Sequence, residues 1–147
     1  MTPELQELAR QAVELPGWRW VCGMVDDYHW RIVRTDEAHT DGRFLLVLDR
    51  VVGGQYEGST GKTLRTWEMS TLPDLSDLAT AGILMNMLRP VLYQVWFQRV
   101  DQKLSTEDEL WCVEVEQRLH LGTFRAPHLG AACALAAVAL GGWPEAS

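Results

Sequence analysis

The sequence predicts an α+β domain in which a mainly antiparallel sheet of about five strands packs against three to four helices. Segments of alternating apolar and polar residues follow one another in the first half of the chain, and stretches with helical periodicity stand mainly at the ends. The resulting order, α-β-β-β-β-α-α-β-α, is typical of this class. With 147 residues, of which 47% are hydrophobic and 22% charged, the chain is predicted to form a single domain over residues 1–147.

The first half is predicted to contain one helix followed by four strands. Thr2 can cap a helix with Pro3 in its first turn, and apolar residues then recur every three or four positions until about Leu15, before Pro16 and Gly17 stop it. Alternation of apolar and polar residues predicts three of the four strands that follow, and residues 43–52 are apolar enough to form a central strand covered on both faces. They are expected at 18–25, 28–35, 43–52 and 62–69.

The second half is predicted to contain helices around one strand. Asp74 or Ser76 can cap a helix that Pro90 ends or kinks, and residues 91–100 are expected to form a further helical piece. Residues 110–124 are the clearest strand, with a bend or turn suggested by Gly122. Its apolar side is predicted to consist of Trp111, Val113, Val115 and Leu119. A helix rich in small residues is expected at 128–140, before a glycine pair.

Charge and cysteine content restrict the partner and the compartment. The net charge is −7, and residues 67–147 hold twice as many acidic as basic residues. Nucleic acid normally requires a basic face, so this balance argues against it as a direct partner. Three widely spaced cysteines (Cys22, Cys112 and Cys133) and an acidic first segment predict a cytoplasmic protein with reduced thiols. No apolar run approaches the ~18 residues of a membrane span.

The segment VVGGQYEGSTGKT (51–63) ends like a phosphate-binding P-loop. That motif requires glycine at the position of Tyr56, whose side chain would crowd the backbone that wraps the phosphates. The residues that follow alternate and soon reach Pro73, so the helix whose N-terminus would face the phosphates is not predicted. We interpret the segment as a hairpin loop.

Other catalytic patterns are weak. Glu114 and Glu116 share one face of the predicted strand about 7 Å apart, as paired carboxylates can, but Arg118 on that face favours a solvated charged stripe. The histidines and cysteines form no HExxH or CxxC pattern, so no metal or cofactor is predicted. Ser59 lacks a nucleophile elbow. The last helix lacks the lysines that a double-stranded-RNA-binding domain carries there.

Aromatic and cationic residues in the first two predicted strands form the candidate ligand- or partner-binding site. If these strands pair, one face would offer rings and the other guanidinium groups, which suits a nucleotide or an acidic partner. Core packing with the charges facing water explains the same pattern. The candidate residues are Trp18, Arg19, Trp20, His29, Trp30, Arg31 and Arg34.

The sequences PGWRW (16–20) and PDLSD (73–77), in this order of elements, resemble a diffuse group of small uncharacterised proteins from bacteriophages and prophages. The resemblance implies a phage context in the host bacterial cytosol and no known activity. By analogy with small phage proteins, we expect a non-catalytic accessory protein that inhibits a host protein or sequesters a small ligand such as a nucleotide. The alternatives are a small enzyme acting on a nucleotide or phosphoester and an acidic mimic of nucleic acid. A homodimer that protects residues 92–97 is left open.

Overall fold

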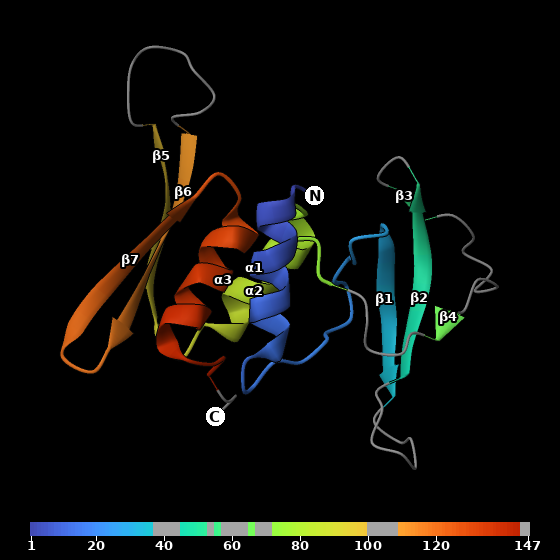
Figure 1. Cartoon of the computed structure of the whole chain (residues 1–147), viewed down its shortest axis with the longest axis horizontal. Coiled ribbons are helices and arrows are strands. Elements are labelled where there is room, and N and C mark those ends of the chain that lie inside the picture. Colours follow the sequence, from blue (N-terminus) through green and yellow to red (C-terminus); the bar gives the residue numbers. More distant parts are fainter. Residues whose placement is uncertain (37–44, 53–54, 57–64, 67–71, 100–108, 145–147) are drawn as a thin grey trace.

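The structure, a computed structural model, describes residues 1–36, 45–52, 55–56, 65–66, 72–99 and 109–144. It confirms the α+β class, because three helices and a three-stranded antiparallel sheet pack together (Figure 1). The helices are α1 (Pro3–Glu14), α2 (Leu78–Met87) and α3 (Leu129–Leu140). The sheet has the order β5 (Leu92–Arg99), β6 (Glu109–Gln117) and β7 (His120–Ala126).

The other strands form a second, separate sheet rather than part of a five-stranded one. β1 (Trp30–Asp36) pairs with β2 (Leu45–Val52), which also pairs with two short strands, β3 (Gln55–Tyr56) and β4 (Arg65–Thr66). The predictions of strands at 28–35 and 43–52 are confirmed, and that at 62–69 is confirmed at Arg65–Thr66. In Figure 1 this sheet lies on the opposite side of the helices from β5–β7.

The core is built around α3. Its small side chains allow close approach to α1, α2, β6 and β7, and Ala132, Ala134 and Ala136 are completely buried. At Gly130, an added Cβ atom would lie 2.4 Å from the carbonyl oxygen of Leu75. Only glycine therefore fits where α3 crosses the segment that precedes α2.

The helix ends follow the sequence, with one correction. Thr2 caps α1 by accepting a hydrogen bond from Leu5 N at 3.2 Å, and Gly141 ends α3 in the left-handed region with φ 77°. The cap of α2 is neither Asp74 nor Ser76 but Asp77, which accepts from Thr80 N at 2.8 Å. Asp74 accepts from the backbone N of Ser76 instead, so it closes the turn before the helix.

Residues 18–25 are not a strand, contrary to the prediction. The chain is irregular from Trp18 and turns at Gly23, which has φ 101° and donates its N–H to the carbonyl of Ile32 at 2.8 Å. Only an isolated bridge joins Val25 to β1. The alternation in this segment arises because Trp18, Trp20 and Met24 pack against the core without strand pairing.

A strand, β5, lies at Leu92–Arg99, where a helix was expected at 91–100. β5 pairs with β6 in antiparallel register from Leu92↔Val115 to Arg99↔Glu109. A bulge between Leu92 and Gln94 breaks the period of two, so the sequence shows apolar residues at mixed spacing. The aromatic and β-branched content of the segment suits a sheet.

Residues 110–124 form two strands rather than one. Gln117 pairs with His120, so the turn consists of Arg118 and Leu119 and lies before the predicted bend at Gly122. Trp111, Val113 and Val115 face the core as predicted, whereas Leu119 at the turn is fully exposed. No helix in the described part of the chain is long and apolar enough to cross a membrane.

Candidate functional site

The aromatic residues of the predicted site meet a third tryptophan from the other end of the chain. The ring centroid of Trp18 lies 5.3 Å from that of Trp20 and 5.6 Å from that of Trp143. Trp143 is 3% exposed, and its Nε1 donates to the carbonyl oxygen of Ala12 at 2.9 Å. This aromatic cluster therefore joins the end of α1 to the segment after α3.

The backbone at this junction explains the PGWRW sequence. Trp143 N donates to the carbonyl oxygen of Pro16 at 2.8 Å. Gly17 has φ 84°, and a Cβ atom added to it would lie 2.3 Å from the carbonyl oxygen of Trp143. The sequence thus supports the fold at this point, and Trp18 and Trp20, each half-buried against the core, leave only part of their rings for a ligand.

The described cationic residues of the predicted site differ in exposure. Arg19 is exposed, whereas Arg31 is half-buried and directs Nη1 toward the carbonyl oxygen of Gly23 at 3.4 Å. The backbones of Trp30 and Arg34 lie in β1, but their side chains are outside the described part of the structure.

His29 lies near a buried carboxylate. Its Nδ1 is 3.9 Å from Oδ2 of Asp74, which is buried, while the imidazole itself is exposed. The residue has φ 64°, and its N–H donates to the carbonyl oxygen of Asp26 at 3.0 Å. The distance to Asp74 exceeds a hydrogen bond, and the other oxygen of Asp74 accepts from the hydroxyl of Ser76 at 2.5 Å. This geometry does not align a base with a nucleophile.

Neither the thiols nor the acidic residues of the described part of the chain form a metal site, because no three potential ligands converge there. Burial raises the pKa of the Cys133 thiol to about 12. A thiol in that environment stays protonated and unreactive at neutral pH. Cys22, by contrast, is exposed.

Glu114 and Glu116 have different environments on the outer face of β6. Glu114 accepts hydrogen bonds from Nε2 of Gln94 at 3.0 Å and from the hydroxyl of Thr123 at 3.1 Å, which ties the three strands together. Glu116 is exposed. The first is a structural acceptor, so the two carboxylates do not act as an acid and base pair.

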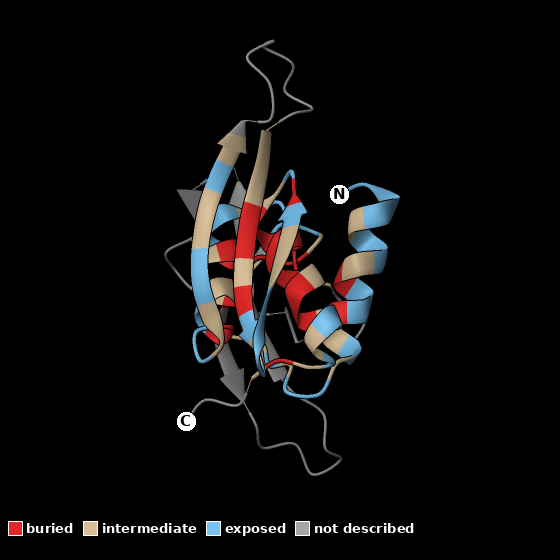
Figure 2. Ribbon diagram, turned by 90° about the vertical axis from the view of Figure 1, so that its left-hand side faces the viewer, coloured by how far each residue is buried: buried red, intermediate tan, exposed pale blue. Residues whose placement is uncertain are grey.

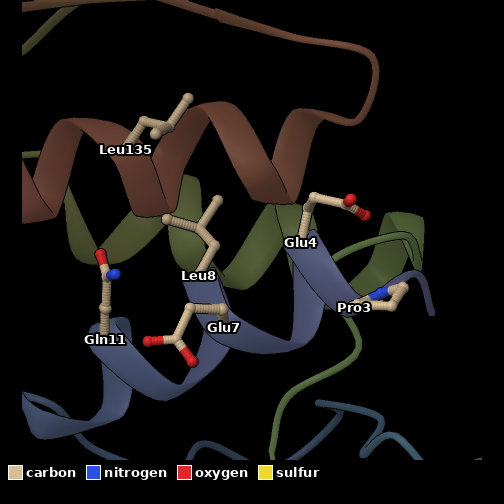
Figure 3. A pocket seen from close by; sticks show the side chains of 6 residues that line it. All are labelled: Pro3, Glu4, Glu7, Leu8, Gln11 and Leu135. Carbon is tan, nitrogen blue, oxygen red and sulfur yellow. The ribbon is translucent and has the colours of Figure 1, made fainter.

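A shallow groove of about 580 Å³ runs between α1 and α3 (Figure 3). Leu8 and Leu135 form its apolar part, and Glu4 and Glu7 project from α1 beside it. Glu7 also pairs with Arg10. Two carboxylates at the edge of an open groove repel the phosphates of a nucleotide.

The candidate P-loop is described only at its beginning. Val51 pairs with Tyr56 across the β2–β3 hairpin, so Tyr56 has extended backbone where the motif requires a glycine. The rest of that segment, including Lys62, lies outside the described residues.

The hairpin tip, defined as Arg118, Leu119, His120 and Leu121, holds the residues that sequence reasoning missed. Leu119 is 100% exposed, Leu121 is 47% exposed, and Arg118 and His120 are exposed as well. Arg118 has φ 55°, a conformation that favours glycine or asparagine in a two-residue hairpin turn. The tip lies at the end of the β6–β7 hairpin, away from the helices (Figure 1). The sequence did not predict a turn here, because the two turn residues are neither Asn nor Gly.

Comparison with known proteins finds no matching family model, no similar curated protein and no similar solved structure. The functional argument therefore depends on the geometry of the chain itself.

Proposed function

We propose that this chain is a non-catalytic binding protein that inserts the hairpin tip into an apolar pocket of a partner protein. The observation that carries the proposal is the full exposure of Leu119 beside Arg118, which has a positive φ. The positive φ opposes folding stability, and the exposed leucine contributes nothing to it. They are explained if the tip gains its stabilising contacts from a second molecule.

The stability that the free protein forgoes at the hairpin tip is large enough to require an explanation. Burying a leucine side chain contributes about 1.5–3 kcal/mol, and Leu119 gains none of it in the free protein. A non-glycine residue in the left-handed region costs roughly 1–2 kcal/mol. Strained or exposed residues of this kind are concentrated at functional sites. The pattern is typical of an anchor residue that fills a pocket on a partner.

Local charge specifies the chemistry of that pocket. The chain has a net charge of −7, but Leu119 stands between Arg118 and His120, both exposed. Glu116 lies beyond the turn, opposite Leu121. A pocket that is apolar inside and acidic at its rim therefore complements the tip. The resemblance to phage proteins adds the proposal that the partner is a host protein in the bacterial cytosol, which binding would inhibit.

The other expected functions have less support in the geometry. Sequestration of a nucleotide is disfavoured at the α1–α3 groove by Glu4 and Glu7. An enzyme has less support because the distance from His29 to Asp74, 3.9 Å, exceeds a hydrogen bond, and the hydroxyl of Ser76 donates to Asp74 rather than to a base.

Affinity capture from a nuclease-treated bacterial lysate tests the proposal. The matched variants are Leu119→Asp at the hairpin tip and Leu78→Asp on α2, where the leucine is 69% exposed. We expect a protein that the wild type and Leu78→Asp retain and that Leu119→Asp loses. Equal capture by all three proteins would show that the tip is not the binding surface.

A further inference from the structure

We propose that two copies of this chain associate by antiparallel pairing of β5 with β5 of the second copy. The strand order is β5-β6-β7, so β5 has one edge paired with β6, and no other strand in the described part of the chain pairs with its second edge. Eight residues long, it is a template for another strand. This association is independent of the partner at the hairpin tip, because the tip belongs to the β6–β7 hairpin and not to the outer edge of β5.

From Gln94 to Gln98, after the bulge, β5 lacks the charges and prolines by which edge strands usually avoid association. Residues 92–98 include no charge and no proline, and α3 packs against β6 and β7 rather than along β5. None of these residues is fully buried, as the outer view of the sheet shows (Figure 2). Tyr93 is 62% exposed and Phe97 is 47% exposed.

The other edge of the sheet is protected. β7 packs against α3, has a glycine at position 122 and ends in the buried residue Ala126. Arg125 places a charge on that edge. The two edges therefore differ in composition, and only β5 is suited to pair with another strand.

Charge favours a second copy as the occupant of this edge. Two molecules that each carry a net charge of −7 repel one another over most of their surfaces. Because residues 92–98 include neither acid nor base, two copies can approach there without placing like charges opposite each other.

The pattern of β5 complements itself in one register. The pairing with β6 places Val95 and Phe97 on the face toward the core, opposite Val113 and Trp111, and Gln94 on the outer face, opposite Glu114. A twofold axis perpendicular to the sheet keeps these faces matched across the two copies.

Centring the axis on Trp96 pairs each of residues 94–98 with one of similar chemistry. Val95 lies opposite Phe97 of the second copy, which is a favourable β-branched and aromatic pair. Gln94 then lies opposite Gln98, and the two Trp96 residues face each other. The product is a continuous six-stranded antiparallel sheet, with both hairpin tips exposed.

A charge-complementation experiment tests both the association and its register. One variant carries Gln94→Lys and Gln98→Lys, and the other carries Gln94→Glu and Gln98→Glu. Each variant alone places like charges opposite each other at two points, whereas a mixture of the two places opposite charges there. Native mass spectrometry separates a monomer of 16.6 kDa from a dimer of twice that mass, and circular dichroism checks that each variant folds.

We expect a dimeric wild type, a monomer for each variant alone and a heterodimer in the equimolar mixture. A monomeric wild type, or variants that remain dimeric alone, would overturn the proposal. A mixture that stays monomeric would refute the register centred on Trp96. Amide hydrogen exchange of the wild type needs no substitution: protection of residues 92–99 should rise with protein concentration, and constant protection would also contradict the pairing.

Discussion

Trp143 Nε1 donates a hydrogen bond to the carbonyl oxygen of Ala12 at 2.9 Å, joining the two ends of the chain across α1 and α3. Trp18, which packs on the same indole, has its own Nε1 buried without a hydrogen-bond partner among the described residues. Two tryptophans in one cluster thus differ in whether their polar group is satisfied.

Replacement of each tryptophan by phenylalanine should separate these roles. Trp143→Phe removes the shorter of two hydrogen bonds to the Ala12 carbonyl, which also accepts from Leu15 N at 3.4 Å. It should lower the free energy of unfolding by about 0.5–1.5 kcal/mol more than Trp18→Phe does. Trp18→Phe removes a buried unsatisfied N–H, which offsets part of the packing that it loses. Urea denaturation of the two variants measures the difference, and equal losses would contradict this account.

A second prediction concerns the contact of α3 with the segment before α2. Gly130→Ala places a methyl group 2.4 Å from the Leu75 carbonyl oxygen, so the backbone must move and stability should fall by about 1–3 kcal/mol. The control is Gly82→Ala in α2, where an added Cβ atom meets nothing within 4 Å. That change should raise stability by roughly 0.5–1 kcal/mol, because alanine favours a helix. The midpoint temperature of thermal unfolding should therefore fall for Gly130→Ala and rise for Gly82→Ala.

Stability should depend on Cys133 at alkaline pH. Its pKa is about 12 in the folded protein, because the thiol is buried, and 9.0 in the unfolded chain. Above pH 9 the unfolded state loses this proton and the folded state keeps it, so stability should fall by up to about 1.4 kcal/mol per pH unit. Below pH 9 the contribution is constant. The free energy of unfolding of the wild type and of Cys133→Ala, measured between pH 8 and pH 11, isolates this effect. The same dependence on pH in both proteins would refute it.

The parts of the fold governed by local chemistry could be predicted from sequence. Thr2 and Gly141 mark helix ends through their own caps, and the apolar run of β2 identifies a strand. In β5, the bulge at Tyr93 interrupts the alternation of apolar and polar residues, so the spacing of its apolar residues resembles that of a helix. The turn at Arg118 was hidden because its residues are not turn formers, and Gly122 gave a false signal.

The candidate site was predictable only in part, for a different reason. Trp18 and Trp20 do lie together, but Trp18 also packs against Trp143, which is distant in sequence. No local pattern reports such a contact. The exposure of Leu119 likewise depends on where the hairpin turns, and a one-strand interpretation placed it on the apolar side.

The hairpin tip should show a conflict between stability and binding. Arg118→Gly relieves the positive φ, and Leu119→Asn supplies a residue that suits a turn, so the double variant should unfold at a higher temperature. It also removes the proposed anchor. A double variant no more stable than the wild type would show that the tip sequence carries no folding cost.

The most direct test of the central claim is the affinity of the captured partner for this Arg118→Gly/Leu119→Asn variant, measured beside the wild type and Leu78→Asp. The account predicts that the double variant binds roughly thirtyfold more weakly, because loss of an anchor residue costs about 2 kcal/mol or more. Leu78→Asp should bind as the wild type does. Unchanged affinity in the double variant would contradict binding through the hairpin tip.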